Sequence, residues 1–338
     1  MKTIIIAEAG VNHNGKIDLA KKLIDIASNS GADYVKFQTF KSEKTVSKRS
    51  KKANYQKKED DTSNSQLELL KNLELSYEDH HILIKYCIKK NIKFLSTAFD
   101  LDSLFFLSTL NIDFLKIPSG EITNLPYLEY ASKLFNKFII STGMASIDEI
   151  KNCINIFLKN KVDLKNITVL HCNTDYPTLM KDVNLKAMLD IKSKLKVDIG
   201  LSDHSLGIEV PVAAVALGAR VIEKHFTISK EMAGPDHSAS LDEIELTNMI
   251  SSIRNVNIAL SGTGLKNPTK SELKNKIYVR KSIHIKNNLK AGKKIVNDDL
   301  IMLRPGDGIS PMKVNNFIGK VTSKNLKSGS KLKLTDLK

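Results

Sequence analysis

Two histidines that could bind a metal, His204 and His225, stand 21 residues apart. The stretch around them, residues 197–227, has the pattern of a strand, a polar turn, a helix of small residues and a second strand. Because a helical crossover between neighbouring strands makes them parallel, we expect both carboxyl ends, and so both imidazoles, at one rim. Imidazole is a common ligand of divalent cations, so the pair is a candidate metal site. The alternative is two rim histidines satisfied by ordinary hydrogen bonds.

Strand-like runs followed by amphipathic helical patterns recur through most of the chain. They occupy residues 3–7, 34–38, 93–97, 114–117, 138–142, 168–171, 198–201 and 220–225. Eight strand–helix units over about 260 residues match a (β/α)₈ TIM barrel, so we predict this α/β fold. A doubly wound open sheet is the alternative, but no Gly-rich dinucleotide fingerprint follows the first run.

Two segments interrupt this rhythm. Residues 41–65 are polar, Lys-rich and long for a βα loop, which is typical of lids and binding loops, and we expect this loop to order when substrate binds. Past residue 259 the composition changes to that of a linker. We therefore predict a barrel domain at 1–262, a linker at 263–278 and a small domain at 279–338. A domain of about 60 residues is marginal alone, so we expect it to dock on another body.

The composition limits the possible partners and compartment. The net charge of +15 could favour nucleic acid, an anionic membrane or anionic small molecules. No nucleic-acid-binding signature accompanies the charge and the chain has no Trp, so we interpret it mainly as solvated lysine on helix faces, such as Lys89 and Lys192. Three cysteines without a pairing pattern suit a reducing compartment. No run approaches the roughly 18 apolar residues of a membrane span. We expect a cytoplasmic protein with neither a nucleic-acid nor a membrane partner.

Nearly every predicted strand ends in a polar or ionisable side chain. In order, these are Glu8, Lys36 and Gln38, Thr97, Lys116, Ser141, His171, Ser202, and Glu223 with His225. In a TIM barrel, catalytic groups lie at the carboxyl ends of the strands. One such residue could be polar by chance, but eight strand ends in register indicate an active site.

The types of these residues favour an anionic, phosphate-bearing substrate. Lys36 and Lys116 supply positive charge. The hydroxyl groups of Thr97, Ser119, Ser141 and Ser202 supply hydrogen-bond donors. Glycines follow Ser119 and Ser141 closely, so backbone N–H groups there could cradle phosphate, although turn formation explains either glycine alone.

Three carboxylates could act in catalysis. Glu8, Glu121 and Asp236 are candidates for a base, an acid or a hydroxyl-binding group. Structural ion pairing is the alternative role for each of them. A metal on the two histidines would act as a Lewis acid that polarises a carbonyl oxygen.

Longer motifs resemble the sialic acid synthase family. They include AEAGVNHNG at 7–15, VKFQTF at 35–40, KIPSGEITNLPYL at 116–128, STGM at 141–144, LHCNTDYPT at 170–178, GLSDHS at 200–205, EKHFT at 223–227 and GPDHSAS at 234–240. RPGDGISP at 304–311 is similar to the antifreeze-like (SAF) domain that ends chains of this family. The resemblance spans nearly the whole chain, with the motifs in the family's order.

The resemblance implies a metal-dependent condensation of phosphoenolpyruvate with an N-acylated amino sugar aldehyde, with release of phosphate. It implies Mn²⁺ as the metal, or Mg²⁺ or Co²⁺, held by His204 and His225. By residue, it implies catalytic roles for Glu8, Lys36 and Glu121; phosphoenolpyruvate contacts from Thr97, Lys116, Ser119, Ser141 and Ser202; and sugar contacts from Gln38, Tyr176, Asp236 and Arg304. In the family, the arginine at the Arg304 position enters the partner subunit's site, which implies a domain-swapped homodimer.

Departures from the family pattern fall on loops at the sugar side. Ala98 and Leu179 stand where Pro is usual, and Asp307 stands where Asn is frequent. The motifs favour N-acetylmannosamine as acceptor, giving N-acetylneuraminate. The alternative is legionaminic acid synthesis from 2,4-diacetamido-2,4,6-trideoxymannose by the same mechanism.

Two other classes of function are distant alternatives. A class I aldolase would form a Schiff base on Lys36 or Lys116 and need no metal. A non-catalytic carbohydrate-binding protein would use the barrel only as a scaffold. The rim of ionisable groups argues against the second.

Overall fold

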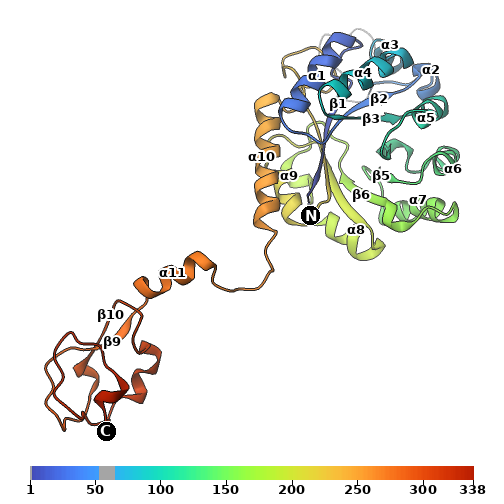
Figure 1. Cartoon of the computed structure of the whole chain (residues 1–338). Helices are drawn as coiled ribbons and strands as arrows, with labels where there is room; N and C mark the ends of the chain where they lie inside the picture. Colours follow the sequence, from blue (N-terminus) through green and yellow to red (C-terminus); the bar gives the residue numbers. More distant parts are fainter. Residues whose placement is uncertain (1, 53–64) are drawn as a thin grey trace. The chain divides into compact units, whose positions relative to one another are not determined.

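The chain folds into a closed parallel barrel followed by a small C-terminal unit, in a computed structural model that describes residues 2–52 and 65–338. The barrel strands are β1 (Ile4–Gly10), β2 (Tyr34–Thr39), β3 (Lys93–Ala98), β4 (Leu115–Ile117), β5 (Phe138–Ser141), β6 (Ile167–Cys172), β7 (Asp198–Asp203) and β8 (Val221–His225) (Figure 1). Each strand pairs in parallel with its neighbour, and β8 closes on β1. The predicted TIM barrel is confirmed, and β1 runs three residues further than expected.

Helices surround the barrel. They are α1 (Ile17–Asn29), α2 (Ser42–Thr45), α3 (Gln66–Lys71), α4 (Tyr77–Lys89), α5 (Leu101–Ser108), α6 (Leu125–Leu134), α7 (Ile147–Lys159), α8 (Ala187–Leu195), α9 (Glu209–Ala216) and α10 (Glu243–Ala259). Local sequence explains their limits. For example, α7 begins at a capping box in which Ser146 and Glu149 bond each other's backbone N–H groups. Its buried residues, Ile150, Ile154 and Phe157 among them, follow the helical period and face the barrel.

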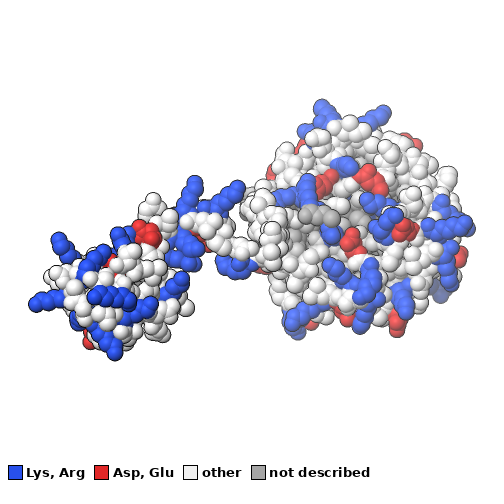
Figure 2. Space-filling model, turned by 60° about the horizontal axis from the view of Figure 1, so that its bottom comes forward, with Lys and Arg blue, Asp and Glu red and all other residues white. Residues whose placement is uncertain are grey.

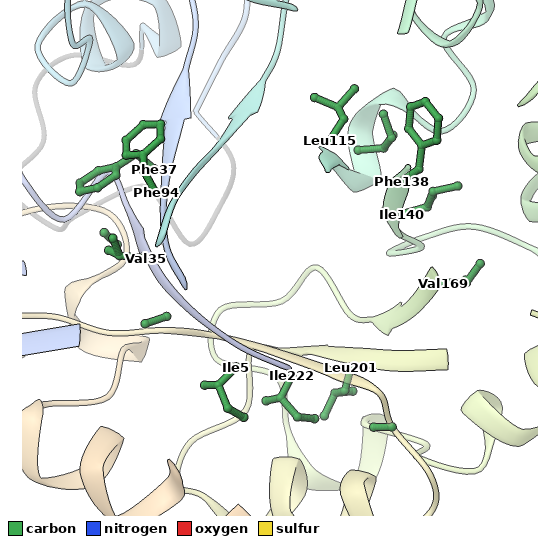
Figure 3. Packing of buried hydrophobic residues seen from close by; sticks show 14 of the residues in the cluster. Ile5, Val35, Phe37, Phe94, Leu115, Phe138, Ile140, Val169, Leu201 and Ile222 are labelled. Carbon is green, nitrogen blue, oxygen red and sulfur yellow. The ribbon is translucent and has the colours of Figure 1, made fainter. Parts of the chain in front are cut away.

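The main core lies between the strands and the helices. Side chains such as Ile5, Val35, Phe37, Leu201 and Ile222 leave the outer face of the barrel and pack in this layer (Figure 3). Successive residues of a strand face opposite sides of the sheet, so the next residue along each strand points into the barrel.

Inside the barrel, an apolar layer lies below a polar one. The apolar cluster contains Ile6, Tyr34, Leu95, Phe114, Ile139, Leu170 and Val221. Two residues further along the same strands stand Glu8, Lys36, Thr97, Lys116, Ser141, Cys172 and Glu223. The period of two therefore places this second set on the inner face, one step nearer the carboxyl ends. The apolar layer fills the amino-terminal end of the barrel, and the polar layer forms the floor of the rim.

The C-terminal unit has its own core. The structure divides into Met1–Gly262 and Thr263–Lys338. In the second unit, β9 (Ser282–Ile285) pairs antiparallel with β10 (Leu300–Leu303), and Ile283, Ile285, Leu300 and Phe317 are among its buried residues. A helix, α11 (Lys270–Val279), occupies the second half of the stretch expected to be a linker and extends one residue past it, and none of its residues is buried.

Two further predictions concern the loop at 41–65 and the absence of a membrane span. Residues 53–64 of the predicted binding loop at 41–65 lie outside the described residues. At its start, Ser42 bonds the Glu74 carboxylate through both its backbone N–H and its hydroxyl group. Within residues 2–52 and 65–338, no helix has the length and apolarity needed to cross a bilayer.

Candidate active site

Four buried charged side chains from four strands meet at the floor of the rim. Lys36 Nζ lies 2.7 Å from Glu8 Oε2 and 3.7 Å from Glu223 Oε2. Lys116 Nζ lies 3.2 Å from Glu223 Oε1. All four side chains are at most 5% exposed. Two lysines and two glutamates thus form one alternating, charge-balanced cluster, in which each carboxylate has a lysine partner.

Uncharged donors and acceptors surround this cluster. Lys36 Nζ donates to Thr97 Oγ1 at 3.0 Å, and Ser202 Oγ donates to Glu223 Oε1 at 3.0 Å. Gln38 Nε2 donates to Glu8 Oε1 at 3.4 Å. The structure therefore brings together six of the residues singled out from the sequence: Glu8, Lys36, Gln38, Thr97, Lys116 and Ser202.

Burial and pairing set opposite pKa directions for the two glutamates. Burial raises the pKa of Glu8 to about 7, against the opposing effect of Lys36. Burial also acts on Glu223, but there Lys116 and Lys36 outweigh it and lower the pKa to about 2. Glu223 is therefore a fixed anion, whereas Glu8 can hold or release a proton near neutral pH. Burial disfavours the charge on Lys116 and lowers its pKa.

The two candidate metal ligands face each other beside the cluster. The ring centroids of His204 and His225 are 5.4 Å apart, and Tyr176 stacks on His204 at 4.0 Å. His204 Nδ1 donates to the Asn173 carbonyl oxygen at 2.5 Å. Burial lowers the pKa of His204, but Cys172 and the Asn173 carbonyl outweigh it and raise the pKa, so a cation competes with a proton at Nε2. Once that proton is lost, the bond to Asn173 keeps the other proton on Nδ1 and leaves Nε2 with a lone pair for the cation.

The surroundings of His225 fit a cation as well. Its Nδ1 is buried and has no hydrogen-bond partner within the described residues, and Asp236 Oδ2 lies 3.8 Å away. Burial, together with His204, lowers the pKa of His225 well below its ordinary value, which favours the neutral, metal-binding form. Burial also raises the pKa of Asp236 to about 6.

The donor set therefore fits an open divalent-cation site with two imidazole nitrogens. Among residues 2–52 and 65–338, no three His, Cys, Asp or Glu side chains are grouped to hold a metal. An ion bound by His204 and His225 would thus take its remaining ligands from water and substrate, as open catalytic sites do.

Two serines extend the site toward β5. Ser119 Oγ accepts a hydrogen bond of 2.9 Å from the Gly143 N–H and lies 3.7 Å from Cys172 Sγ. A Cβ at Gly143 would stand 2.5 Å from Thr174 Cγ2, so only glycine permits this close approach. Ser141 Oγ is buried without a partner in the described structure, and is thus available to a ligand. The Gly143 N–H is thus bonded to Ser119, and the expected phosphate cradle stays a prediction.

Two predicted site residues have no described bond to this network. Glu121 pairs with Asn124, whose Nδ2 donates to Glu121 Oε2 at 2.6 Å, and no described bond joins Glu121 to the charged cluster. Burial raises its pKa. Arg304 belongs to the C-terminal unit and not to the barrel unit.

Glu223 is the residue whose importance the sequence analysis missed. Its place at a strand end and within a motif assigns it no role, although it contacts both lysines and Ser202. Its spacing was the available signal. Glu223 stands two residues before His225 on one strand, so both side chains face the inside of the barrel.

Comparisons with known proteins identify relatives along the whole chain. Residues 23–265 match the NeuB family and residues 280–338 match the SAF domain. The N,N′-diacetyllegionaminic acid synthase of Campylobacter jejuni is 51% identical over 96% of this chain and 97% of its own. The protein of the same name from Legionella pneumophila is 47% identical over 98% of this chain and 94% of its own. The crystal structure of the N-acetylneuraminic acid (sialic acid) synthetase of Leptospira borgpetersenii is 35% identical, with a TM-score of 0.71 over 81% of this chain and 90% of its own.

Proposed function

The chain belongs to the NeuB family and is a phosphoenolpyruvate-dependent synthase with a C-terminal SAF domain; from this premise we propose that it is an N,N′-diacetyllegionaminic acid synthase. The observation that carries the proposal is identity of 51% and 47%, over nearly full length, to two synthases of that name. The sialic acid synthetase structure is 35% identical. The motifs ranked N-acetylmannosamine first as acceptor, but the relatives favour the diacetamido sugar that was the alternative.

Phosphoenolpyruvate binds over the charged cluster. Lys36 and Lys116 supply the positive charge for its carboxylate and phosphate, and the partnerless Ser141 hydroxyl, with Ser119, donates to phosphate oxygens. Burial strengthens these contacts because the local dielectric is low. Burial disfavours a charge on Lys36, yet Glu223 and Glu8 outweigh it and raise the pKa, so Lys36 stays cationic. A protonated Lys36 is a poor Schiff-base nucleophile, which disfavours the aldolase alternative for this residue.

The acceptor aldehyde lies on the histidine side of the site. A divalent cation, with Mn²⁺ as the first candidate, would act there as a Lewis acid on the aldehyde oxygen. His204 and His225 would hold the cation, while Gln38, Tyr176 and Asp236 contact the open-chain sugar. Gln38 reaches Glu8, and Asp236 reaches His225, so the sugar-binding groups border both parts of the site.

The reaction joins the two substrates and consumes one water. C3 of phosphoenolpyruvate forms a bond to C1 of the aldehyde, and water adds to the oxocarbenium carbon C2. Loss of inorganic phosphate from the resulting tetrahedral intermediate gives the nonulosonic acid. Glu8, with its pKa of about 7, supplies the proton that the aldehyde oxygen takes up as the new C–C bond forms. Glu121, held by Asn124, positions the attacking water.

An acceptor competition tests the choice of sugar. The protein is incubated with phosphoenolpyruvate, Mn²⁺ and equal amounts of the diacetamido sugar and N-acetylmannosamine, and the products are separated by mass. The account predicts mainly N,N′-diacetyllegionaminic acid, with kcat/KM at least tenfold higher for the diacetamido sugar. A preference for N-acetylmannosamine would return the assignment to sialic acid synthesis. Product from neither sugar would overturn both assignments.

A mixing experiment tests the proposed role of Arg304 in a swapped homodimer. Subunits carrying His225→Ala lack the metal site, and subunits carrying Arg304→Ala lack the arginine. If each site combines one barrel with the partner's arginine, randomly mixed dimers regain about a quarter of full activity, because half are mixed and one of their two sites is complete. Activity equal to the sum of the two separate variants after subunit exchange would contradict the swap.

A further inference from the structure

A second pair of charged residues, Asp203 and Lys224, lies on the outer face of strands β7 and β8. Asp203 ends β7 and Lys224 lies in β8, and the two residues are register partners across these strands. Ser202 and Glu223, one position earlier on each strand, bond to each other inside the barrel. By strand alternation, Asp203 and Lys224 point outward, into the layer between the sheet and the helices. Neither side chain belongs to the site described above.

This outer pair is buried and hydrogen-bonded. The side chains of Asp203 and Lys224 are 3% and 1% exposed. Lys224 Nζ donates to Asp203 Oδ2 and, at 2.5 Å, to the Ser205 carbonyl oxygen. Asp203 Oδ1 accepts from the Ser205 N–H at 3.0 Å and from Ser205 Oγ at 2.8 Å. One carboxylate and one ammonium group thus tie together residues 203, 205 and 224.

These residues flank the two histidines. Asp203 and Ser205 stand on either side of His204, and Lys224 directly precedes His225. The neighbouring backbone completes the support, because the His204 carbonyl accepts from the Thr178 N–H at 2.8 Å. A change in the separation of the two strand ends would therefore move both imidazoles.

Stability alone gives little reason for such a pair. Removing two charges from water is costly, and replacing a buried ion pair by well-packed apolar residues is often neutral or stabilising. A cation site, by contrast, requires its ligands to be held within about half an ångström of their working geometry. Groups behind the ligands commonly supply that restraint.

We propose that Asp203 and Lys224 are positioning residues that fix His204 and His225 for cation binding without touching substrate. The proposal rests on the metal role given to the histidines under the proposed function. It extends the site to a charged pair on the outer side of the barrel wall.

Mn²⁺ affinity, measured without substrate by the electron paramagnetic resonance signal of the free ion, tests the proposal. In the variant Asp203→Leu/Lys224→Met, both charges are replaced by apolar groups of similar size, so no charge is left unpaired. We expect a folded protein whose Kd for Mn²⁺ rises tenfold or more, the range typical of lost support behind ligands. A changed visible spectrum of bound Co²⁺ would report the altered ligand geometry. An unchanged Kd in the folded double variant would overturn the proposal.

A second variant keeps the test decisive if the double variant does not fold. Ser205→Ala removes only the hydroxyl bond to Asp203, and we expect a two- to fivefold rise in Kd. Unchanged Mn²⁺ affinity in Ser205→Ala would then count against the proposal.

A matched control lies at the other end of the barrel. Asp33 Oδ2 accepts from Arg254 Nη2 at 2.7 Å and from the Ile5 N–H at 2.8 Å, so this pair also ties a barrel strand to its surroundings. Asp33→Asn/Arg254→Met is expected to lower thermal stability and leave the Kd for Mn²⁺ within twofold. An equal loss of affinity in this control would show a general effect of destabilisation and overturn the proposal.

A further comparison separates the proposal from the function on which it rests. If wild-type protein and His204→Ala bind Mn²⁺ equally, the metal role of the histidines fails, whatever the outer pair does. If His204→Ala abolishes binding and the outer variants bind normally, only the positioning proposal fails.

Discussion

The barrel unit and the C-terminal unit carry their charges in contrasting ways. Residues 1–262 contain 34 Lys and Arg against 32 Asp and Glu, a net charge of +2. Residues 263–338 contain 18 against 5, a net charge of +13. In Figure 2, both signs mix on the surface of the barrel, whereas Lys and Arg predominate on the smaller unit. Nearly all of the excess positive charge thus belongs to less than a quarter of the chain.

The contrast shows that burial, rather than net charge, marks the chemistry. Glu8, Lys36, Lys116 and Glu223 add nothing to the net charge, yet they lie where a low dielectric makes each interaction strong. Exposed charges are instead screened within roughly 8–10 Å at physiological salt. The prediction that the excess positive charge lies on helix faces such as those of Lys89 and Lys192 was wrong. Both lysines belong to the barrel unit, whereas nearly all of the excess charge lies in residues 263–338.

The largest effect is expected from a buried lysine. Lys116→Met removes one of the two lysine partners of Glu223 and a contact of the phosphoenolpyruvate anion, so kcat/KM is expected to fall at least 10³-fold, about 4 kcal/mol of transition-state stabilisation. The matched control in the C-terminal unit is Lys327→Ala, at an exposed lysine. Steady-state phosphate release should be within twofold of wild type for the control. A similar loss of kcat/KM in both variants would contradict the contrast between buried lysines of the barrel unit and exposed lysines of the C-terminal unit.

A pH effect on stability is expected from His13 in the barrel. Burial lowers its pKa from 6.5 to about 4, so between these values the unfolded state binds more protons. The contribution of His13 to the free energy of unfolding is therefore complete above pH 6.5. As the pH falls toward 4, about 3 kcal/mol of this stability is lost. Urea denaturation of wild type and His13→Gln at several pH values isolates the pH-dependent contribution of His13 to stability. A stability difference that stays constant over the range would contradict it.

Two glycines with left-handed backbone give a smaller contrast. Gly10 has φ +53°, and a Cβ there would lie 3.3 Å from His225 Cε1. Gly264 has φ +73°, and a Cβ there would meet nothing within 4 Å. Gly264→Ala is expected to cost only the backbone strain, about 1 kcal/mol. Gly10→Ala should cost more and also weaken Mn²⁺ binding, because it presses on the imidazole. Equal thermal midpoints and Mn²⁺ affinities would refute the difference.

The smallest effect is expected at an exposed pair in the C-terminal unit. Lys331 Nζ lies 2.6 Å from Asp307 Oδ1, and both side chains are partly exposed, at 33% and 45%. Surface pairs of this kind often contribute nothing measurable. Asp307→Asn, which restores the residue frequent at this position in the family pattern, is expected to leave the thermal midpoint unchanged. A clear drop would mean that this unit also depends on its ion pairs.

Strand periodicity accounts for how much of the site could be predicted. The alternation that buries Ile6 and Leu95 also places Glu8 and Thr97 at the rim. The side chains at the strand ends could therefore be predicted from the sequence. The strands of a TIM barrel close in chain order, but Glu223 of β8 meets Lys36 of β2 and Lys116 of β4 across the barrel interior. Such contacts depend on the stagger of the strands and on the reach of the side chains, which the sequence pattern does not specify. The central place of Glu223 therefore emerged only with the structure.

Other features depend on contacts between distant segments. The bond from His204 to the Asn173 carbonyl joins residues 31 positions apart, and no local pattern specifies it. The polar composition of 263–278 predicted a linker, although its Thr269–Glu272 capping box could have indicated α11.

The most direct test of the account is metal-dependent phosphate release from phosphoenolpyruvate and the diacetamido sugar. The protein is stripped with a chelator, assayed, and assayed again with Mn²⁺, beside His204→Ala and His225→Ala. The account predicts no release from stripped protein, recovery with Mn²⁺, and no recovery in either variant at the same Mn²⁺ concentration. Full release from stripped protein, or recovery in both histidine variants, would contradict it.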